Sequence, residues 1–277
     1  STELSHFGWV NSLGKHSESL SHQSGKNLLL CARREEKIIP AQVIKDALED
    51  KVEQLEVEHG RSATKKEKEQ FKEDIMFELM PRAFSRITDT HGYLNPEHNI
   101  IVINSSSRSK AEDFLALLRK SLGSLPVTSL SPERQPDEVM TDWINENSTL
   151  EDFALSDKFT LGQEAQLNSV GDDSAVIRVK NMALDIDEVK VHLDADMFVT
   201  KIGLEYDDCM SFMLNDDLSI KRLKFFDVLA EQNDDIDSDD ILSRLDADFA
   251  LMAGELNRMI GDINSEFSIS ANDYLDE

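Results

Sequence analysis

The chain has 277 residues, of which 40% are apolar and 30% charged, and its formal net charge is −26. Gly, Pro and Cys are all scarce, which excludes a disordered chain and a disulfide-stapled mini-protein. No apolar run approaches the roughly 18 residues of a membrane span, and no signal peptide is expected. Cys31 and Cys209 stand far apart, which fits a reducing, cytoplasmic compartment and no metal-ligand pattern.

The charge is divided unevenly along the chain. Up to Leu125 there are 18 Lys and Arg against 19 Asp and Glu, whereas the remainder has 11 against 36. A strongly acidic protein repels nucleic acid, but a local cluster of cations attracts it. The first half concentrates its cations in residues 61–72 and 81–86. This asymmetry predicts that the first half meets a polyanion, while the acidic half keeps the chain soluble.

The first elements form a projecting hairpin. Residues 27–32 (NLLLCA) predict a buried strand that ends at the charged REEK. Apolar residues at i, i+4, i+8 and i+11 predict a helix over 40–58, which His59-Gly60 ends. A second helix is expected from about 62 to 80, stopped by Pro81. Because its first half (TKKEKEQ) has no apolar face, the two helices predict a hairpin that extends into solvent.

Further elements alternate between helices and strands. After the hairpin we expect strands over 82–88 and 99–104, then a helix over 109–122 that Gly123 ends. A Ser- and Pro-containing linker follows. The acidic remainder predicts a helix over 137–145, a strand over 175–180, a short helix over 186–193, a three-stranded antiparallel meander over 197–205, 209–215 and 218–225, and a long helix from about 240 to 263.

These elements predict an α+β fold with mixed or antiparallel sheets, a helical-hairpin finger and a long C-terminal helix. Three regions are expected. Residues 1–39 and 89–125 form a central α+β region, residues 40–88 the finger, and residues 126–277 an acidic α+β region with the meander and the last helix.

Two motifs weakly suggest nucleotide or metal binding. GWVNSLGKH resembles a phosphate-binding loop, but five residues separate Gly8 from Gly14, and His16 replaces the required Ser or Thr. A surface loop is favoured there. Residues 233–240 (NDDIDSDD) have calcium-loop spacing, but Asp240 stands where Gly must turn. A helix N-terminus capped by Asp237 or Ser238 is favoured instead.

No catalytic signature is apparent. Histidine, serine and cysteine form no nucleophile pattern, and Asp172-Asp173 lacks the partners of a metal nuclease, so that a surface turn is favoured. The sequence therefore predicts a protein that is not an enzyme and has no cofactor and no metal.

The finger carries a cationic stripe. Lys65, Lys68 and Lys72 share one helical face, and Arg61 sits at the hairpin turn. Such cations suit a phosphate backbone. The alternative is an ordinary salt-bridged solvent face, because Glu69 and Glu73 flank the stripe.

The segment PRAFSR follows the finger. If residues 82–88 are extended, Arg82, Phe84 and Arg86 share one face. Two guanidinium groups beside an aromatic ring suit phosphate pairing with base contact or wedging. The alternative is a core phenylalanine with arginines that reach past it to solvent.

Several long stretches together resemble the bacterial recombination-associated RdgC family, in order and over almost the whole chain. They are CARREEKIIPAQVIKDALE, PRAFSR, KAEDFLALLRKSLGSLPV, IKRLKFFD followed by NDDIDSDD, and DADFALMAGEL. The resemblance implies a cytoplasmic, nucleoid-associated homodimer that closes into a ring around duplex DNA without sequence specificity. It also implies inhibition of RecA-promoted strand exchange, a role in recombination and replication-fork repair, and no catalysis.

The resemblance also implies positions that contact DNA. Arg82, Phe84 and Arg61 match finger residues of the family, and a further contact patch falls on Lys180, where Asn181 and Met182 replace the family's Lys-Gln pair. The family's opening strand and helix lie upstream of Ser1. Double-stranded DNA is the expected partner, with single-stranded DNA as a second candidate, and the rival reading is an acidic adaptor or DNA mimic that binds a recombinase directly. The predicted DNA-binding residues are Arg61, Lys65, Lys68, Lys72, Arg82, Phe84, Arg86 and Lys180.

Overall fold

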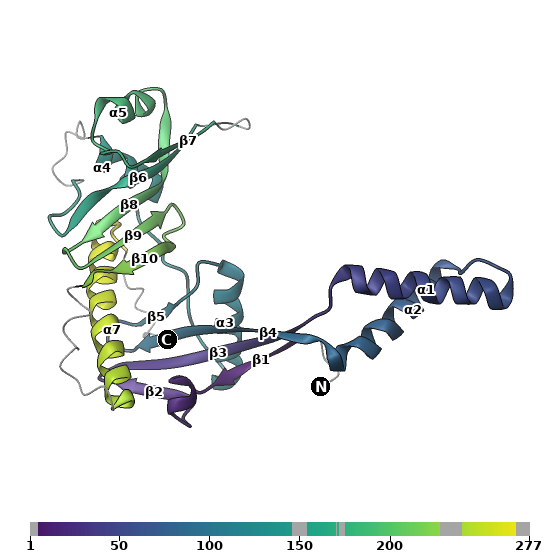
Figure 1. Ribbon diagram of the computed structural model, residues 1–277. Helices are drawn as coiled ribbons and strands as arrows, with labels where there is room; N and C mark the ends of the chain where they lie inside the picture. The colour runs from purple at the N-terminus through teal and green to yellow at the C-terminus, as the bar shows by residue number, and fades with distance from the viewer. Residues whose placement is uncertain (1–4, 146–153, 170, 172–174, 228–239, 270–277) are drawn as a thin grey trace.

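Two antiparallel sheets, a pair of helices that extends away from them and a long C-terminal helix make up the chain (Figure 1). The computed structural model describes residues 5–145, 154–169, 171, 175–227 and 240–269. Every strand pairing within those ranges is antiparallel. The predicted α+β class, with antiparallel sheets and a C-terminal helix, is therefore confirmed.

The first sheet, sheet A, is built around two long strands. Its order is β1-β3-β4-β5, and β2 also pairs with β3. The strand predicted over 27–32 continues to Ile38, so that REEK lies inside the strand and not at its exit. Charged residues are tolerated there because the outer half of β3 is only partly buried. The bounds are β1 Ser5–Val10, β2 Ser21–Ser24, β3 Asn27–Ile38, β4 Phe84–Asn95 and β5 Ile100–Ile103.

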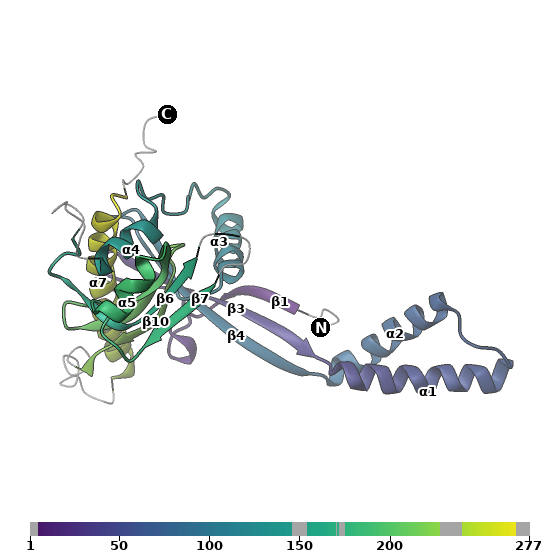
Figure 2. The same ribbon diagram turned by 90° about the horizontal axis from the view of Figure 1, so that it is seen from above.

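Helices α1 (Ala41–His59) and α2 (Lys65–Leu79) form a pair that extends away from the body in both views (Figures 1 and 2). Gly60 ends α1 in the left-handed conformation, with φ of 61°, and its N–H donates to the Glu56 carbonyl. The second helix begins at Lys65 rather than 62. The reason is a capping box in which Thr64 accepts from the Glu67 N–H while the Glu67 carboxylate accepts from the Thr64 N–H.

The chain makes one tight turn between α2 and β4. Met80–Arg82 is a 3-10 turn, closed by the Ala83 N–H donating to the Met80 carbonyl at 3.2 Å. The strand predicted to begin at Arg82 therefore begins at Phe84. Pro81 explains the difference, because its fixed φ suits a helical turn as well as it stops an α-helix.

Helix α3 (Arg108–Leu122) covers sheet A. The Phe114 side chain is 0% exposed, and its ring stands edge-on to the Trp9 ring, with 5.2 Å between centroids. Gly92 lies beneath it, where a Cβ would come within 2.8 Å of Phe114 Cζ. This close approach makes Phe114 the centre of the packing between α3 and the sheet.

The second sheet, sheet B, has the order β10-β9-β8-β6-β7. The predicted meander is confirmed as β8, β9 and β10, but β6 was not anticipated. Helices α4 (Pro136–Ile144) and α5 (Asp187–Leu193) agree with their predicted ranges. The strand bounds are β6 Phe159–Ser169, β7 Val176–Lys180, β8 Met197–Tyr206, β9 Met210–Asn215 and β10 Ile220–Phe225.

Helix α7 (Ile241–Glu266) joins the two sheets (Figure 1). Toward sheet A, the Tyr93 hydroxyl donates to Asn257 Oδ1 at 2.9 Å. Toward sheet B, the Tyr206 hydroxyl donates to Asp262 Oδ2 at 2.5 Å. Phe249, Leu256, Met259 and Ile263 of its predicted apolar stripe are buried in the resulting common core. Most side chains of this stripe therefore pack against other parts of the same chain.

The α7 N-terminus is capped by Asp240, whose side chain accepts from the Ser243 N–H. The caps proposed from the sequence, Asp237 and Ser238, lie outside the described residues. So do the rest of the calcium-like run before Asp240 and the pair Asp172-Asp173.

Candidate nucleic-acid interface

The lysine stripe of the helical pair is exposed. Lys65, Lys68 and Lys72 all lie on the solvent side of α2. In the part of the chain that the structure describes, none of the three forms an ion pair, whereas Arg61 nearby does. These lysines are therefore not paired with carboxylates of the described residues, and their ammonium groups are available to an external anion.

Arg61 is held at the turn between α1 and α2. Its guanidinium donates to both oxygens of Glu67, at 2.9 and 2.7 Å. The bidentate bonds from Arg61, helped by those from Thr64, hold the pKa of the Glu67 carboxyl far below its usual range. Glu67 thus stays ionised and offsets most of the Arg61 charge, so that a phosphate has to compete for this guanidinium.

The root of the helical pair presents an exposed aromatic ring. Phe84 is 85% exposed, and its cross-strand neighbour Ile38 is 45% exposed. Phe84 is therefore not a core residue, and the core alternative for PRAFSR is wrong. The exposed ring beside an exposed isoleucine makes a small apolar patch, which a partner can cover.

Two arginines flank this ring. Arg82 is exposed in the 3-10 turn and forms no ion pair with any described residue. Arg86 shares the face of Phe84 on β4, two residues on, and donates to Glu36 Oε2 at 2.5 Å. This bond lowers the pKa of the Glu36 carboxyl. Of the two arginines beside Phe84, Arg82 is therefore the one without a carboxylate partner among the described residues, although it lies outside β4.

Lys180 lies apart from the other predicted residues. It ends β7 in sheet B, whereas the other seven lie on the helical pair and its root (Figure 1). Asn181 follows it in the left-handed region, with φ of 54°, and Met182 is 42% exposed. The candidate residues therefore fall into two groups. Seven lie on the helical pair and its root, which continue from sheet A, and Lys180 lies on sheet B.

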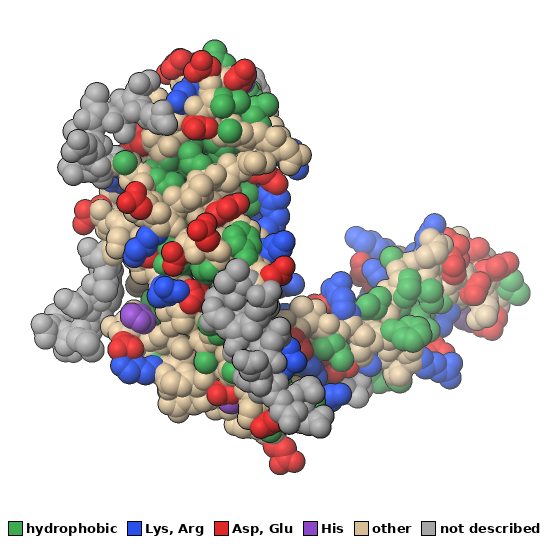
Figure 3. Space-filling view, turned by 60° about the vertical axis from the view of Figure 1, so that its left-hand side comes forward, with side chains coloured by type: hydrophobic (Ala, Val, Ile, Leu, Met, Phe, Trp, Pro, Cys, Tyr) green, Lys and Arg blue, Asp and Glu red, His purple; other side chains and the backbone are tan. Residues whose placement is uncertain are grey.

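Sequence reasoning missed a cluster of cations around Lys180. The strands of sheet B carry six Lys and Arg and only two carboxylates, Glu164 and Glu205, although the chain beyond Leu125 is otherwise strongly acidic. Figure 3 shows Lys and Arg side chains gathered along one flank of the body, above the root of the helical pair. We call the six the basic face of sheet B: Arg178, Lys180, Lys201, Lys221, Arg222 and Lys224.

Strand register places these cations on one side of the sheet. Lys221 stands opposite Met213 and Gly203, and Lys224 stands opposite Ser211 and Glu205. Lys201 and Arg178 both donate to Gln166 Oε1, at 3.1 and 3.4 Å. Because the core side of the same strands is apolar, this basic face is the open side of the sheet. The sequence signals were local to two strands: Arg178 and Lys180 alternate with apolar residues in VIRVK, and three cations stand within IKRLKF.

Among the described residues, those considered for nucleotide binding or catalysis are not arranged as an active site. Gly8 lies within β1 and Gly14–His16 is a single 3-10 turn, so that no phosphate-binding loop is formed there. Burial raises the pKa of both cysteine thiols to about 11, which disfavours the nucleophilic thiolate. Among the described residues, no three His, Cys, Asp or Glu side chains are grouped to hold a metal ion. No described helix is long and apolar enough to cross a bilayer.

Comparison with known proteins shows to which family the chain belongs. A family model described as "Putative exonuclease, RdgC" matches residues 1–269. The chain is 64% identical over its full length to a recombination-associated protein RdgC of Colwellia psychrerythraea, of which it covers 88%. It is 48% identical to that of Aeromonas hydrophila, with 94% of this chain and 84% of the relative aligned, and 46% identical to that of Tolumonas auensis, with 95% and 85% aligned. The chain therefore belongs to the RdgC family of recombination-associated proteins.

Proposed function

We propose that the chain binds duplex DNA without sequence preference and modulates recombination through that binding, with no enzymatic step. The observation that carries the proposal is the exposed Phe84 between Arg82 and Arg86, at the root of a projecting helical pair. Guanidinium groups pair with phosphates, which carry no base identity, while the ring contacts or wedges against bases. Single-stranded DNA is a second ligand of the same chemistry.

In this proposal two chains close into a ring around the duplex, with the helical pair acting as a finger. The resemblance of the motifs to the RdgC family supports a homodimer, association with the nucleoid and antagonism of RecA-promoted strand exchange. The charge distribution supports the same arrangement. Cations have to line only the surface that faces DNA, while acid elsewhere opposes wrapping and aggregation.

Duplex affinity is expected to fall steeply with salt, because each phosphate contact releases condensed counterions. A gel-shift titration of the purified chain between about 50 and 200 mM salt, on several unrelated duplexes, measures the salt dependence and the sequence preference of binding. A flat salt response, or a clear preference for one sequence, would refute the proposal.

The protein is expected to be a homodimer in solution. One helical pair presents too few cations to hold a duplex, whereas two chains can surround it. Since most of the α7 stripe is buried within the chain, α7 would support an interface rather than form it. Sedimentation equilibrium at micromolar concentration measures the mass, and a monomer of the full-length protein would count against the ring.

Two rival functions are separated by simple assays. An acidic adaptor that binds a recombinase directly is favoured only by the net charge, and it would show no retention of duplex DNA. The description of the family model names an exonuclease. If an activity that purifies with the protein progressively shortens end-labelled DNA and depends on Mg²⁺, the non-enzymatic proposal is overturned.

A further inference from the structure

Helix α7 meets sheet A through a set of polar side chains. The Tyr93 hydroxyl donates to Asn257 Oδ1 at 2.9 Å, and Asn257 Nδ2 donates to Asn27 Oδ1 at 3.1 Å. Asn27 Oδ1 also accepts from Asn95 Nδ2 at 2.9 Å. Tyr93 and Asn95 belong to β4 and Asn27 to β3, so that Asn257 of α7 is bonded to both long strands of sheet A. We call these four residues the polar clasp.

The hydrogen bonds of the polar clasp fix one another's direction. Tyr93 and Asn95 are each 3% exposed. Asn95 Oδ1 accepts from two backbone N–H groups of the following turn, at 3.0 and 3.1 Å, and its Nδ2 points to Asn27. If the Asn257 amide were rotated by half a turn, its oxygen would face Asn27 Oδ1, and two acceptors would meet. A rotation of α7 against the strands would therefore leave buried polar groups unpaired.

Apolar packing also holds α7 against sheet A, but it fixes the direction of the helix less closely. Phe249 of α7 is 5% exposed, and its ring centroid lies 5.9 Å from that of Tyr93 and 6.2 Å from that of His22. Burial of apolar area is not directional, whereas a hydrogen bond weakens steeply when it bends. The polar clasp is therefore the part of this contact that is most sensitive to the angle between α7 and the strands.

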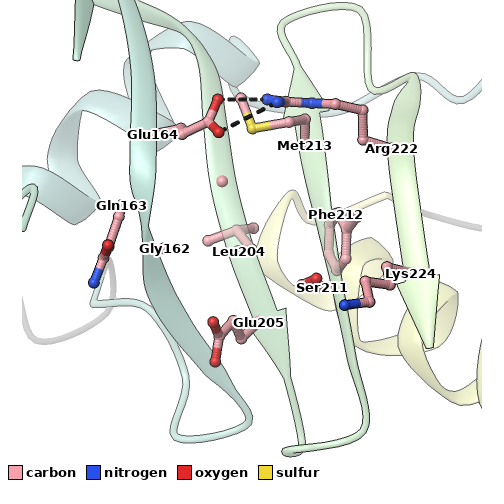
Figure 4. A pocket seen from close by; sticks show the side chains of 11 residues that line it. Gly162, Gln163, Glu164, Leu204, Glu205, Ser211, Phe212, Met213, Arg222 and Lys224 are labelled. Carbon is pink, nitrogen blue, oxygen red and sulfur yellow. Dashed lines mark hydrogen bonds and ion pairs between the residues drawn. The ribbon is translucent and has the colours of Figure 1, made fainter. Parts of the chain in front are cut away.

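On its other side α7 forms one body with sheet B (Figure 1). Leu256, Met259 and Ile263 are buried in the core that the helix shares with that sheet. The open side of sheet B is braced as well, because the Arg222 guanidinium of β10 donates to both Glu164 oxygens of β6, at 3.2 and 2.7 Å (Figure 4). The polar clasp thus joins two bodies, sheet B with α7 and sheet A with the helical pair.

We propose that Asn257 is a positioning residue for DNA binding, which through Tyr93 and Asn27 sets the direction in which β3, β4 and the helical pair leave the body. The two strands continue in unbroken register from the clasp to Phe84, so that the orientation fixed at Asn257 reaches the proposed DNA-contacting surface. A surface already held in its binding orientation does not have to be ordered when DNA arrives, which raises affinity without a new contact. The inference rests on the proposed DNA binding, but it concerns the geometry of the free chain.

The test begins with a variant that removes the clasp bonds of α7 and keeps its packing. Tyr93→Phe with Asn257→Leu retains the aromatic ring and nearly the volume of the amide, and Asn27 Oδ1 keeps its bond from Asn95. Since both partners of the bond between Tyr93 and Asn257 become apolar, the midpoint of denaturant unfolding is expected to stay near that of the unmodified chain.

The direction of the helical pair is measured without DNA. Glu58→Cys on α1 and Glu188→Cys on α5 supply two exposed positions for spin labels, and both native cysteines are buried. Labelled chains are diluted with unlabelled ones, so that pulsed electron paramagnetic resonance gives the distance within one chain. The clasp variant is expected to show a distance distribution about twofold wider, because directional bonds no longer limit the angle.

The matched control removes a tyrosine hydroxyl from the opposite side of the same helix. In Tyr206→Phe, Asp262 loses its bond from the hydroxyl but keeps the one from Lys158. The distance distribution of this control is expected to stay as narrow as that of the unmodified chain, because the lost bond lies within the body that α7 forms with sheet B.

Duplex affinity is then measured over a salt titration. The clasp variant is expected to bind about fivefold more weakly, because its surface has to be ordered on binding. The slope of log affinity against log salt should not change, since no phosphate contact is lost. A distribution as narrow as that of the control would overturn the positioning role. A wider distribution with unchanged affinity, or a smaller salt slope, would overturn its link to DNA binding.

A second variant covers the case in which the double variant does not fold. Tyr93→Phe alone removes one hydroxyl and is expected to widen the distribution to a smaller extent, and an unchanged width there would equally overturn the positioning role. If the unmodified chain does not bind duplex DNA, the proposed function fails, whereas the distance measurement still decides what the polar clasp does.

Discussion

Reversing the charges of Arg61, Arg82 and Arg86 together is expected to lower duplex affinity on the order of a hundredfold at 0.15 M salt, because three phosphate contacts are lost. Inhibition of RecA-promoted strand exchange should fall in parallel, since the proposed route is competition for the duplex. Excess duplex should relieve inhibition by the unmodified chain. Shift assays and strand-exchange assays on the same preparations measure the two effects.

The three arginines are not expected to contribute equally. Glu67 and Glu36 already hold Arg61 and Arg86, whereas Arg82 forms no ion pair with a described residue. Arg82→Glu alone should therefore account for the largest share. Lys15→Glu, Lys26→Glu and Lys120→Glu together, at exposed positions outside the helical pair, change the net charge as much as the triple variant and control for it. If the triple variant loses DNA binding yet inhibits fully, the acidic-adaptor reading replaces the one proposed.

Two phenylalanine truncations are expected to have opposite effects. Phe84→Ala should weaken DNA binding with little change in stability, because its ring is 85% exposed. Phe114→Ala should lower the free energy of unfolding by about 3–5 kcal/mol, because its ring is fully buried between Trp9 and Gly92. The fraction of Phe114→Ala protein that remains folded should bind DNA normally, because Phe114 faces the core.

Denaturant unfolding and shift assays on both variants decide the matter. The pair is a matched control, since the same atoms are removed from an exposed site and from a buried one. A large drop in the melting temperature of Phe84→Ala, with unchanged DNA affinity of the folded protein, would assign Phe84 a structural role instead.

Strong periodicity made most helices predictable. The apolar spacing in 40–58, 109–122 and 240–263 identified α1, α3 and α7 to within a few residues. The apolar pattern did not fix the exact ends of the helices, because these depend on which capping residue is used. Thr64 with Glu67 moved the start of α2, and Asp240 supplied a cap closer to α7 than those proposed.

The missed strands lack the local pattern that identifies a strand in sequence. In β6 the register shifts twice along its pairing with β8, and polar residues occupy the open side, so that no clean alternation remains. β1 and β2 are short, partly exposed strands, and β2 contains no apolar residue. β1 is defined by its pairing with β3, which lies beyond β2 in the chain and which local propensity does not encode, whereas β2 joins β3 through the short turn at Gly25 and Lys26.

The candidate surface was predictable only where it is local in sequence. Phe84 and its arginines lie within six consecutive residues, and their exposure follows from the Pro81 stop. The basic face of sheet B joins Arg178, Lys201 and Arg222 from three separate strands. It exists only once the order β10-β9-β8-β6-β7 brings those strands together.

The long ladder between β3 and β4 gives the helical pair a mechanical property. Eleven consecutive residue pairs, from Leu28 opposite Leu94 to Ile38 opposite Phe84, connect the core to the root of the helices. A ribbon of this length spans about 35 Å, and α1 adds about 28 Å beyond it. A bend of a few degrees where the ribbon leaves the core therefore moves the helical tip by several ångströms. The twist of these two strands therefore sets where the helical tip lies relative to the core.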